Sequence, residues 1–92
     1  MIRVGVIGYG YWGPNLVRNF AELPGVQVAA VSDLRPERLA LVKSRYPSVH
    51  TMADHREMLA DSGIDAVAIA TPISTHSDLA LQALQADKHV LV

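Results

Sequence analysis

Short apolar runs alternate along the chain with stretches in which apolar residues recur at helical spacing. The runs at 3–7, 26–31 and 65–70 consist mostly of valine, isoleucine and alanine. Apolar runs of this length predict strands that are buried on both faces. A short edge strand is predicted at 49–51, and a final strand at 89–92, where the sequence ends.

A first helix is predicted between the first two apolar runs. Leu16, Val17 and Phe20 are spaced so that they share one helical face. Pro14 suits the first turn of a helix, because the N–H that proline lacks would have no partner there. Gly25 follows a proline and indicates where this helix ends.

Three more helices are predicted in the same way. The second starts at Arg35 and ends before Pro47. The third opens with the form of a capping box, in which Asp54 and Glu57 are three residues apart. The fourth, at 75–86, has a Thr-x-x-Asp start that again predicts a side-chain cap.

Strands that alternate with helices predict a parallel sheet with helices on both faces. We therefore predict an α/β fold, a doubly wound parallel sheet of about five strands in the order 3-2-1-4-5. With 92 residues, the chain suits one domain, 1–92, and leaves no room for a second.

Composition narrows the classes of function. Half of the residues (50%) are hydrophobic and 18% are charged, which supports a packed core and excludes a disordered chain. The formal net charge is −1. A nearly neutral chain is a poor candidate for binding nucleic acid or an anionic membrane.

Cysteine content and apolar run lengths bear on where the protein works. The sequence has no cysteine, which excludes disulfides, thiolate metal sites and a thiol nucleophile. The apolar runs are too short to span a bilayer, and the start lacks the pattern of a secretory signal. We therefore expect a cytoplasmic protein without a membrane partner.

A glycine-rich motif lies directly between the first predicted strand and the first predicted helix. It reads Gly8-Tyr9-Gly10-Tyr11-Trp12-Gly13, which is G-x-G-x-x-G. In this context the first glycine permits a tight turn, the second lets the backbone approach a pyrophosphate, and the third lets helix and strand pack closely. The helix N-terminus then offers N–H groups and a positive dipole end to the phosphates. The motif predicts a dinucleotide site; the alternative is a loop of a protein that binds no nucleotide.

An aspartate, Asp33, occupies the position at which dinucleotide sites carry an acidic residue. Asp33 ends the second predicted strand, about 20 residues beyond the motif, where an acidic residue accepts hydrogen bonds from the adenosine ribose. Because a carboxylate repels a 2′-phosphate, we expect NAD as cofactor in preference to NADP. The alternative for Asp33 is a turn or cap residue before Pro36.

The arginines and large aromatic residues in and near the motif each have more than one possible role. Arg35 and Arg38 would stack on adenine, accommodate a 2′-phosphate, or simply lie on a solvated helix face. Tyr11 and Trp12 would shield the pyrophosphate or face a partner surface. The remaining candidate, a metal site, is not predicted, because the four histidines lack the close spacing of metal ligands.

Two segments resemble a known family. Residues 4–20, which contain the glycine motif, resemble the opening of the glucose-fructose oxidoreductase/inositol dehydrogenase (Gfo/Idh/MocA) family. Residues 70–76 and 88–92 match a second family pattern, so the resemblance covers essentially the whole chain. The similarity is greatest to members that act on sugars and sugar nucleotides. It implies a Rossmann fold that binds NAD.

The resemblance adds residues to the predicted cofactor site. In the family, the Thr-Pro turn after the fourth strand passes near the nicotinamide ribose, and a histidine at the start of the next helix lies close by. This implies cofactor contacts for Thr71, Pro72 and His76. The alternative is that Thr71 and Pro72 only end a strand and that His76 only occupies a first helical turn.

Family members continue from this last strand into a Glu-Lys-Pro motif, whose lysine serves in catalysis, and then into a large substrate domain. The sequence given stops at Val92, before that motif. We therefore expect a truncated domain that binds the dinucleotide without turnover. The alternative is a truncated or designed folding and assembly module with little cofactor binding. In either case an edge strand at 90–92 invites pairing with a second chain, so we expect a homodimer.

Overall fold

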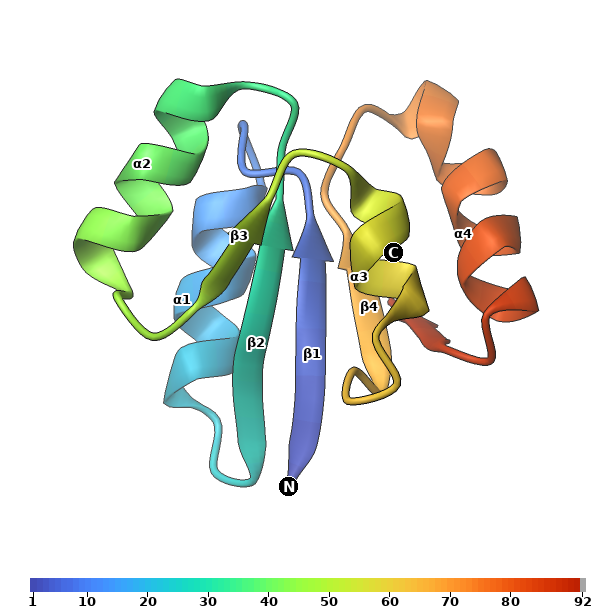
Figure 1. Cartoon of the computed structure of the whole chain (residues 1–92), viewed down its shortest axis with the longest axis horizontal. Coiled ribbons are helices and arrows are strands. Elements are labelled where there is room, and N and C mark those ends of the chain that lie inside the picture. The colour runs from blue at the N-terminus through green and yellow to red at the C-terminus, as the bar shows by residue number, and fades with distance from the viewer. Residues whose placement is uncertain (92) are drawn as a thin grey trace.

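Five parallel strands form one sheet in the order β3-β2-β1-β4-β5. The computed structural model describes residues 1–91, and Figure 1 shows the arrangement. The strands are β1 (Ile2–Ile7), β2 (Val26–Ser32), β3 (His50–Met52), β4 (Ala66–Ile69) and β5 (His89–Leu91). This confirms the predicted Rossmann fold and strand order. Val92, which was predicted to belong to the last strand, lies outside the described residues.

The helices are α1 (Gly13–Glu22), α2 (Pro36–Arg45), α3 (His55–Ala60) and α4 (His76–Gln85), with a 3-10 turn, η1 (Ile73–Thr75), before α4. Each predicted helix is present, and only η1 was not predicted. α2 starts one residue later than predicted because Arg35 is extended, with φ −99° and ψ 115°. A residue that precedes proline is sterically restricted to this region.

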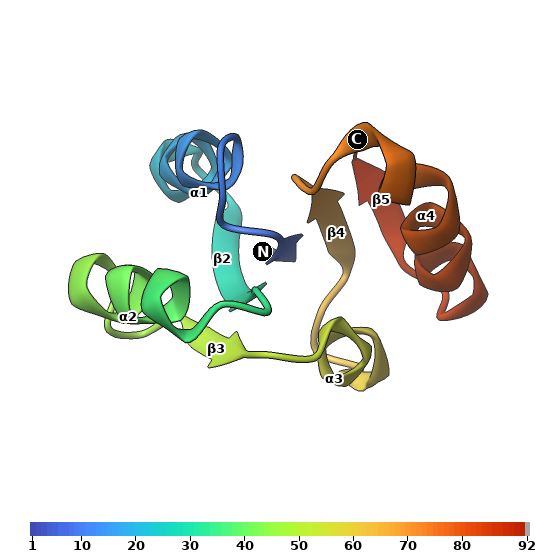
Figure 2. The ribbon, with the colours of Figure 1, turned by 90° about the horizontal axis from the view of Figure 1, so that it is seen from above.

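The core lies in two layers, one on each face of the sheet. On one face, Val17 of α1 and Val42 of α2 belong to a buried cluster; on the other, Met58 of α3 and Leu79 of α4 belong to a second. Figure 2 shows the two pairs of helices on opposite sides of the twisted sheet. The strands between them need apolar residues on both faces, which explains their continuous apolar runs.

Two predicted helix caps have different outcomes. At α3, Asp54 Oδ1 accepts a hydrogen bond from the Arg56 N–H at 2.9 Å, which confirms Asp54 as the cap. The return bond from the Glu57 side chain that a capping box needs is not made within residues 1–91. The predicted side-chain cap at Thr75 is wrong. Thr75 Oγ1 instead donates to the Pro72 carbonyl oxygen at 2.7 Å, because the chain forms η1 before α4 begins.

None of the helices described is long and apolar enough to cross a membrane.

Candidate functional site

A cleft of about 1120 Å³ opens at the carboxyl ends of the strands. The loops after β1 and β4 both reach this edge, and the strand order reverses between these two strands, which is where doubly wound sheets bind ligands. Most residues predicted for the cofactor site line it: Gly8, Gly10, Tyr11, Trp12, Asp33, Arg35, Arg38, Thr71, Pro72 and His76. Tyr9 and Gly13 are set back from the cleft.

The glycine loop is tightly folded. Gly8 has φ +96°, and a Cβ there would lie 2.9 Å from Thr71 Cγ2. A Cβ on Gly13 would collide with the Gly8 carbonyl oxygen. At Gly10, by contrast, a Cβ would approach the flexible Arg38 guanidinium, 3.0 Å from Nη1. The first and third glycines are therefore required by the fold, whereas the space above Gly10 belongs to the cleft.

Main-chain N–H groups of this loop are available to an anion. Within residues 1–91, the N–H groups of Gly10, Tyr11 and Trp12 donate to no protein acceptor. They precede the N-terminus of α1, whose dipole favours negative charge. The loop therefore fits a pyrophosphate, which needs N–H donors and a second position that carries no Cβ.

Tyr9 contributes to this loop through its main chain. Its side chain is only 4% exposed and packs in the buried cluster beneath α1 and α2. Burial raises the pKa of its phenol above the ordinary value. Its N–H donates to Asp33 Oδ2 at 2.8 Å, which ties the loop to the end of β2.

Asp33 is almost fully buried, at 8% exposure, and both of its oxygens have partners. Oδ2 accepts from the Tyr9 N–H, and Oδ1 accepts from the Arg35 N–H at 2.8 Å. Each carboxylate oxygen has two lone pairs, so further acceptor capacity remains for a ribose hydroxyl. Asp33 thus both shapes the loop and lines the cleft.

The two arginines differ in their placement. Arg38 Nη1 lies 3.5 Å from Asp33 Oδ2, and its guanidinium also lies against Gly10. Arg35 has an exposed side chain and engages Asp33 only through its main chain. Arg38 is therefore the cation next to the predicted ribose position.

The β4–α4 connection forms the opposite wall. Thr71 Oγ1 lies 2.6 Å from Thr75 Oγ1, and His76 Nε2 lies 2.6 Å from the Thr71 carbonyl oxygen. Because a carbonyl oxygen only accepts, His76 donates from Nε2 and holds the Thr71-Pro72 turn in place. The structure thus brings all three residues to the cleft.

Large apolar side chains surround the cleft mouth. Tyr11 is 82% exposed and Trp12 is 59% exposed, and their rings meet edge to face with centroids 4.8 Å apart. Leu34 and Ile73 are also highly exposed and line the same cleft. Exposed apolar groups gathered around one cleft are typical of a ligand site.

One wall of the cleft was not predicted from the sequence. It is formed by the β3–α3 connection and the inner side of α4: Ala53, Asp54, His55, Arg56, Asp78, Leu79 and Gln82. The spacing of four between Asp78 and Gln82 on α4 is the one signal that was visible in the sequence, because such residues share a helical face.

On this wall, the Arg56 side chain and N–H both donate to Asp54 and hold the pKa of its carboxyl at about 2, below its ordinary 3.8.

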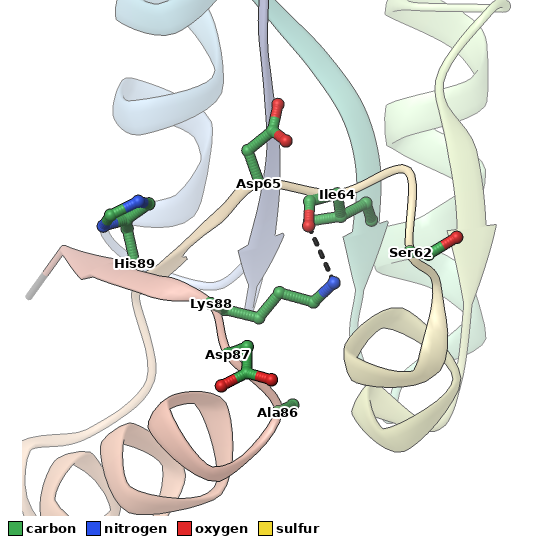
Figure 3. A pocket seen from close by; sticks show the side chains of 7 residues that line it. All are labelled: Ser62, Ile64, Asp65, Ala86, Asp87, Lys88 and His89. Carbon is green, nitrogen blue, oxygen red and sulfur yellow. Dashed lines mark hydrogen bonds between the residues drawn. The ribbon is translucent and has the colours of Figure 1, made fainter.

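A smaller hollow of about 370 Å³ lies at the opposite, amino end of the strands. Figure 3 shows Lys88 there, with Nζ donating to the Ile64 carbonyl oxygen at 2.7 Å. Lys88 Nζ also donates to the Asp61 carbonyl oxygen at 2.6 Å. Lys88 thereby joins the end of α3 to the strands, and we assign the hollow a structural role.

Within the part of the chain that the structure describes, no three His, Asp or Glu side chains gather in a way that could hold a metal ion.

The sequence profile of the oxidoreductase family with an NAD-binding Rossmann fold, Gfo/Idh/MocA, matches residues 2–92. The chain belongs to this family. A similar relative is "Glycosyl hydrolase family 109 protein 1" of Bacteroides fragilis (strain YCH46), at 35% identity over 100% of this chain and 22% of the relative. The family resemblance expected from residues 4–20 and 70–76 is confirmed.

Two of the solved structures that resemble this chain contain a bound dinucleotide. One is scyllo-inositol dehydrogenase from Lactobacillus casei with NAD(H) and scyllo-inositol, with a TM-score of 0.89 and 29% identity, covering 98% of this chain and 27% of that one. The other is KijD10, a 3-ketoreductase from Actinomadura kijaniata with NADP and TDP-benzene, with a TM-score of 0.89 and 28% identity, covering 98% and 28%. The chain spans about a quarter of the length of the curated relatives it matches.

Proposed function

We propose that residues 1–92 form the dinucleotide-binding domain of an oxidoreductase that acts on a sugar or polyol, and that NAD is its preferred cofactor. The observation that carries this proposal is the glycine loop, whose N–H groups have no acceptor within residues 1–91 and border the cleft beside Asp33. The family membership and the inositol dehydrogenase with bound NAD(H) support it.

The chain's own residues would hold the dinucleotide by its two ends and its centre. The N–H groups of Gly10, Tyr11 and Trp12 would donate to the pyrophosphate. Asp33 would accept from the adenosine ribose, and the turn at Thr71, Pro72 and His76 would border the nicotinamide ribose, in keeping with the family resemblance. When bound, the dinucleotide supplies the hydride chemistry, and these residues orient it.

The preference for NAD follows from charge. A 2′-phosphate would lie beside the buried Asp33 carboxylate, and like charges in such proximity destabilise binding. Arg38, 3.5 Å from that carboxylate, offsets part of the repulsion. Isothermal titration of the 92-residue chain is expected to give binding to NADP about tenfold weaker than to NAD. Equal affinities would contradict the preference.

Two glycine-to-alanine substitutions, one in the cleft and one away from it, test the position of the pyrophosphate. In Gly10→Ala, the new methyl group would occupy space above the loop that we assign to the pyrophosphate. The nearest protein atoms to this methyl group are those of the flexible Arg38 guanidinium, which can move aside. We expect NAD affinity to fall about tenfold or more, with stability little changed.

Gly63→Ala is the matched control, because its Cβ would also meet a side-chain end, Asp61 Oδ1 at 3.2 Å, far from the cleft. It should bind NAD like the unsubstituted chain. If both variants bind equally well, the pyrophosphate is not at Gly10. If the unsubstituted chain binds neither dinucleotide, the alternative of a folding and assembly module is favoured.

We further propose that the chain self-associates as a homodimer through the edge of the sheet at β5. β5 pairs only with β4 among the described strands, and Leu91 on it is half-exposed. An open strand edge with an apolar side chain favours pairing with a second copy. Sedimentation at tens of micromolar is expected to show a dimer, and a monomer at all concentrations would refute this.

A further inference from the structure

One part of the cleft lining, which we name the slot, combines apolar residues with polar side chains. Leu34 after β2, Ala53 after β3 and Leu79 of α4 are apolar residues of the lining. His55 and Gln82, which lie farther along α3 and α4, line the same cleft and are half-buried. Sites for small molecules are usually lined by apolar side chains with a few polar groups that fix the ligand's orientation.

The hydrogen bonds at the polar end fix the orientation of Gln82. Its Nε2 donates to Asp78 Oδ2 at 3.3 Å, and its Oε1 lies 2.9 Å from His55 Nε2. Because a carboxylate only accepts, the amide NH₂ must face Asp78 and the amide oxygen must face His55, which therefore donates. Among the residues that the structure describes, one N–H of Gln82 and one oxygen of Asp78 have no partner and remain for a ligand.

The position of Asp33 directs a base into this slot. The Asp33 N–H donates to the Met52 carbonyl oxygen at 3.2 Å, so the end of β3 and Ala53 lie immediately beside it. A ribose held at Asp33 with its phosphate at the glycine loop carries its base on the far side from that loop. We assign the base to that side, where Ala53 of the slot lies beside Asp33.

We propose that Asp78 and Gln82 recognise the Watson–Crick edge of adenine and so select the base of the dinucleotide. Asp78 would accept from the N6 amino group, and Gln82 would donate to N1, the donor and acceptor that adenine presents there. This inference rests on the proposed function, since it needs a dinucleotide in the cleft. His55 acts on Gln82 only, as a positioning residue.

Deamino-NAD, which carries hypoxanthine, tests the proposal. Hypoxanthine has an acceptor at O6 and a donor at N1, so both groups oppose their partners. We expect the 92-residue chain to bind deamino-NAD about tenfold more weakly than NAD in isothermal titration. In Gln82→Met, which removes the donor at nearly constant size, and in Asp78→Ala, we expect the ratio of the two affinities to fall toward one.

Gln85→Met is the matched control, because Gln85 lies on the exposed face of α4 and outside the cleft lining. It should keep the tenfold ratio. Equal binding of NAD and deamino-NAD by the unsubstituted chain would overturn base selection and leave the proposed function standing. A ratio of NAD to deamino-NAD affinity that is unchanged in both Gln82→Met and Asp78→Ala would also overturn base selection and leave the proposed function standing. Absence of binding by either dinucleotide would overturn both proposals.

Discussion

At single residues, main-chain geometry decides which side chain a position accepts. Gly8 and Gly25 have positive φ, of 96° and 77°, which only glycine adopts without strain. Asp87, between α4 and β5, has φ 61° and is the only non-glycine residue with positive φ among residues 1–91. Aspartate tolerates this left-handed conformation better than most residues, yet less well than glycine.

Asp87→Gly is therefore expected to stabilise the protein by about 1 kcal/mol. The reason is that glycine relieves the left-handed strain, and the substitution leaves the main-chain bond from the Asp87 N–H to the Leu84 carbonyl oxygen possible. Urea denaturation of the two chains measures the difference. Asp87→Ala is the control: it also removes the carboxylate but retains Cβ, so it should not stabilise. Equal effects of glycine and alanine would assign the change to the lost charge.

Among the helices and strands, α3 shows how a short segment is held in the fold. It has only six residues, too few to be stable alone, and it is held by the Asp54 cap and by Met58, which is fully buried. Asp54 also binds its neighbour Arg56 through Nε and Nη2, at 3.0 and 2.9 Å.

The Asp54 cap predicts a pH dependence. Its pKa is lowered to about 2 from 3.8, first by the Arg56 side-chain hydrogen bond, so the ionised form stabilises the folded state. This contribution is complete above the unfolded pKa and is lost as pH falls through the folded value. We expect an NMR titration of the Asp54 carboxyl to give a midpoint near 2.

Asp54→Asn provides a comparison, because asparagine also caps helices but does not titrate. The stability advantage of the unsubstituted chain over this variant should be present at about pH 5 and should decrease steadily toward pH 2. An advantage that does not change with pH would show that charge at this position contributes nothing.

Across the whole molecule, the cleft connects the two halves of the sheet. The β2 side supplies Asp33 and Arg38, and the β4 side supplies Thr71 and His76. The two buried clusters lie on opposite faces and share the central strands. A ligand in the cleft would therefore contact residues on the β2 side and on the β4 side of the sheet. Its binding would stabilise both sides of the folded domain together.

Dinucleotide binding should accordingly raise global stability. At a free NAD concentration about 100 times its Kd, the free energy of unfolding is expected to rise by about 2.7 kcal/mol, because NAD binds the folded state only. Urea denaturation with and without NAD measures this. Gly10→Ala, with weaker binding, should show a smaller increase at the same concentration. An increase that is the same for both chains would argue against binding at the glycine loop.

The order of strands and helices, the sheet topology and the position of the glycine loop could all be predicted from the sequence. The elements follow from local rules, because apolar periodicity marks each element and proline and glycine mark the ends. The strand order follows from the arrangement common to doubly wound sheets. The carboxyl ends of parallel strands must meet at one edge. Asp33 was predicted from its place beyond the glycine motif and Thr71 from the family resemblance, and the structure places both residues along one cleft.

What each side chain in the cleft contacts became clear only from the tertiary structure. Tyr9 lies in the motif yet packs in the core, and Thr75 bonds within η1 rather than capping α4. The wall that includes His55, Asp78 and Gln82 depends on α3 and α4 covering the same face of the sheet. Such contacts join segments distant in sequence through side-chain packing, for which no local pattern exists, so they form only when the two layers of helices close on the sheet.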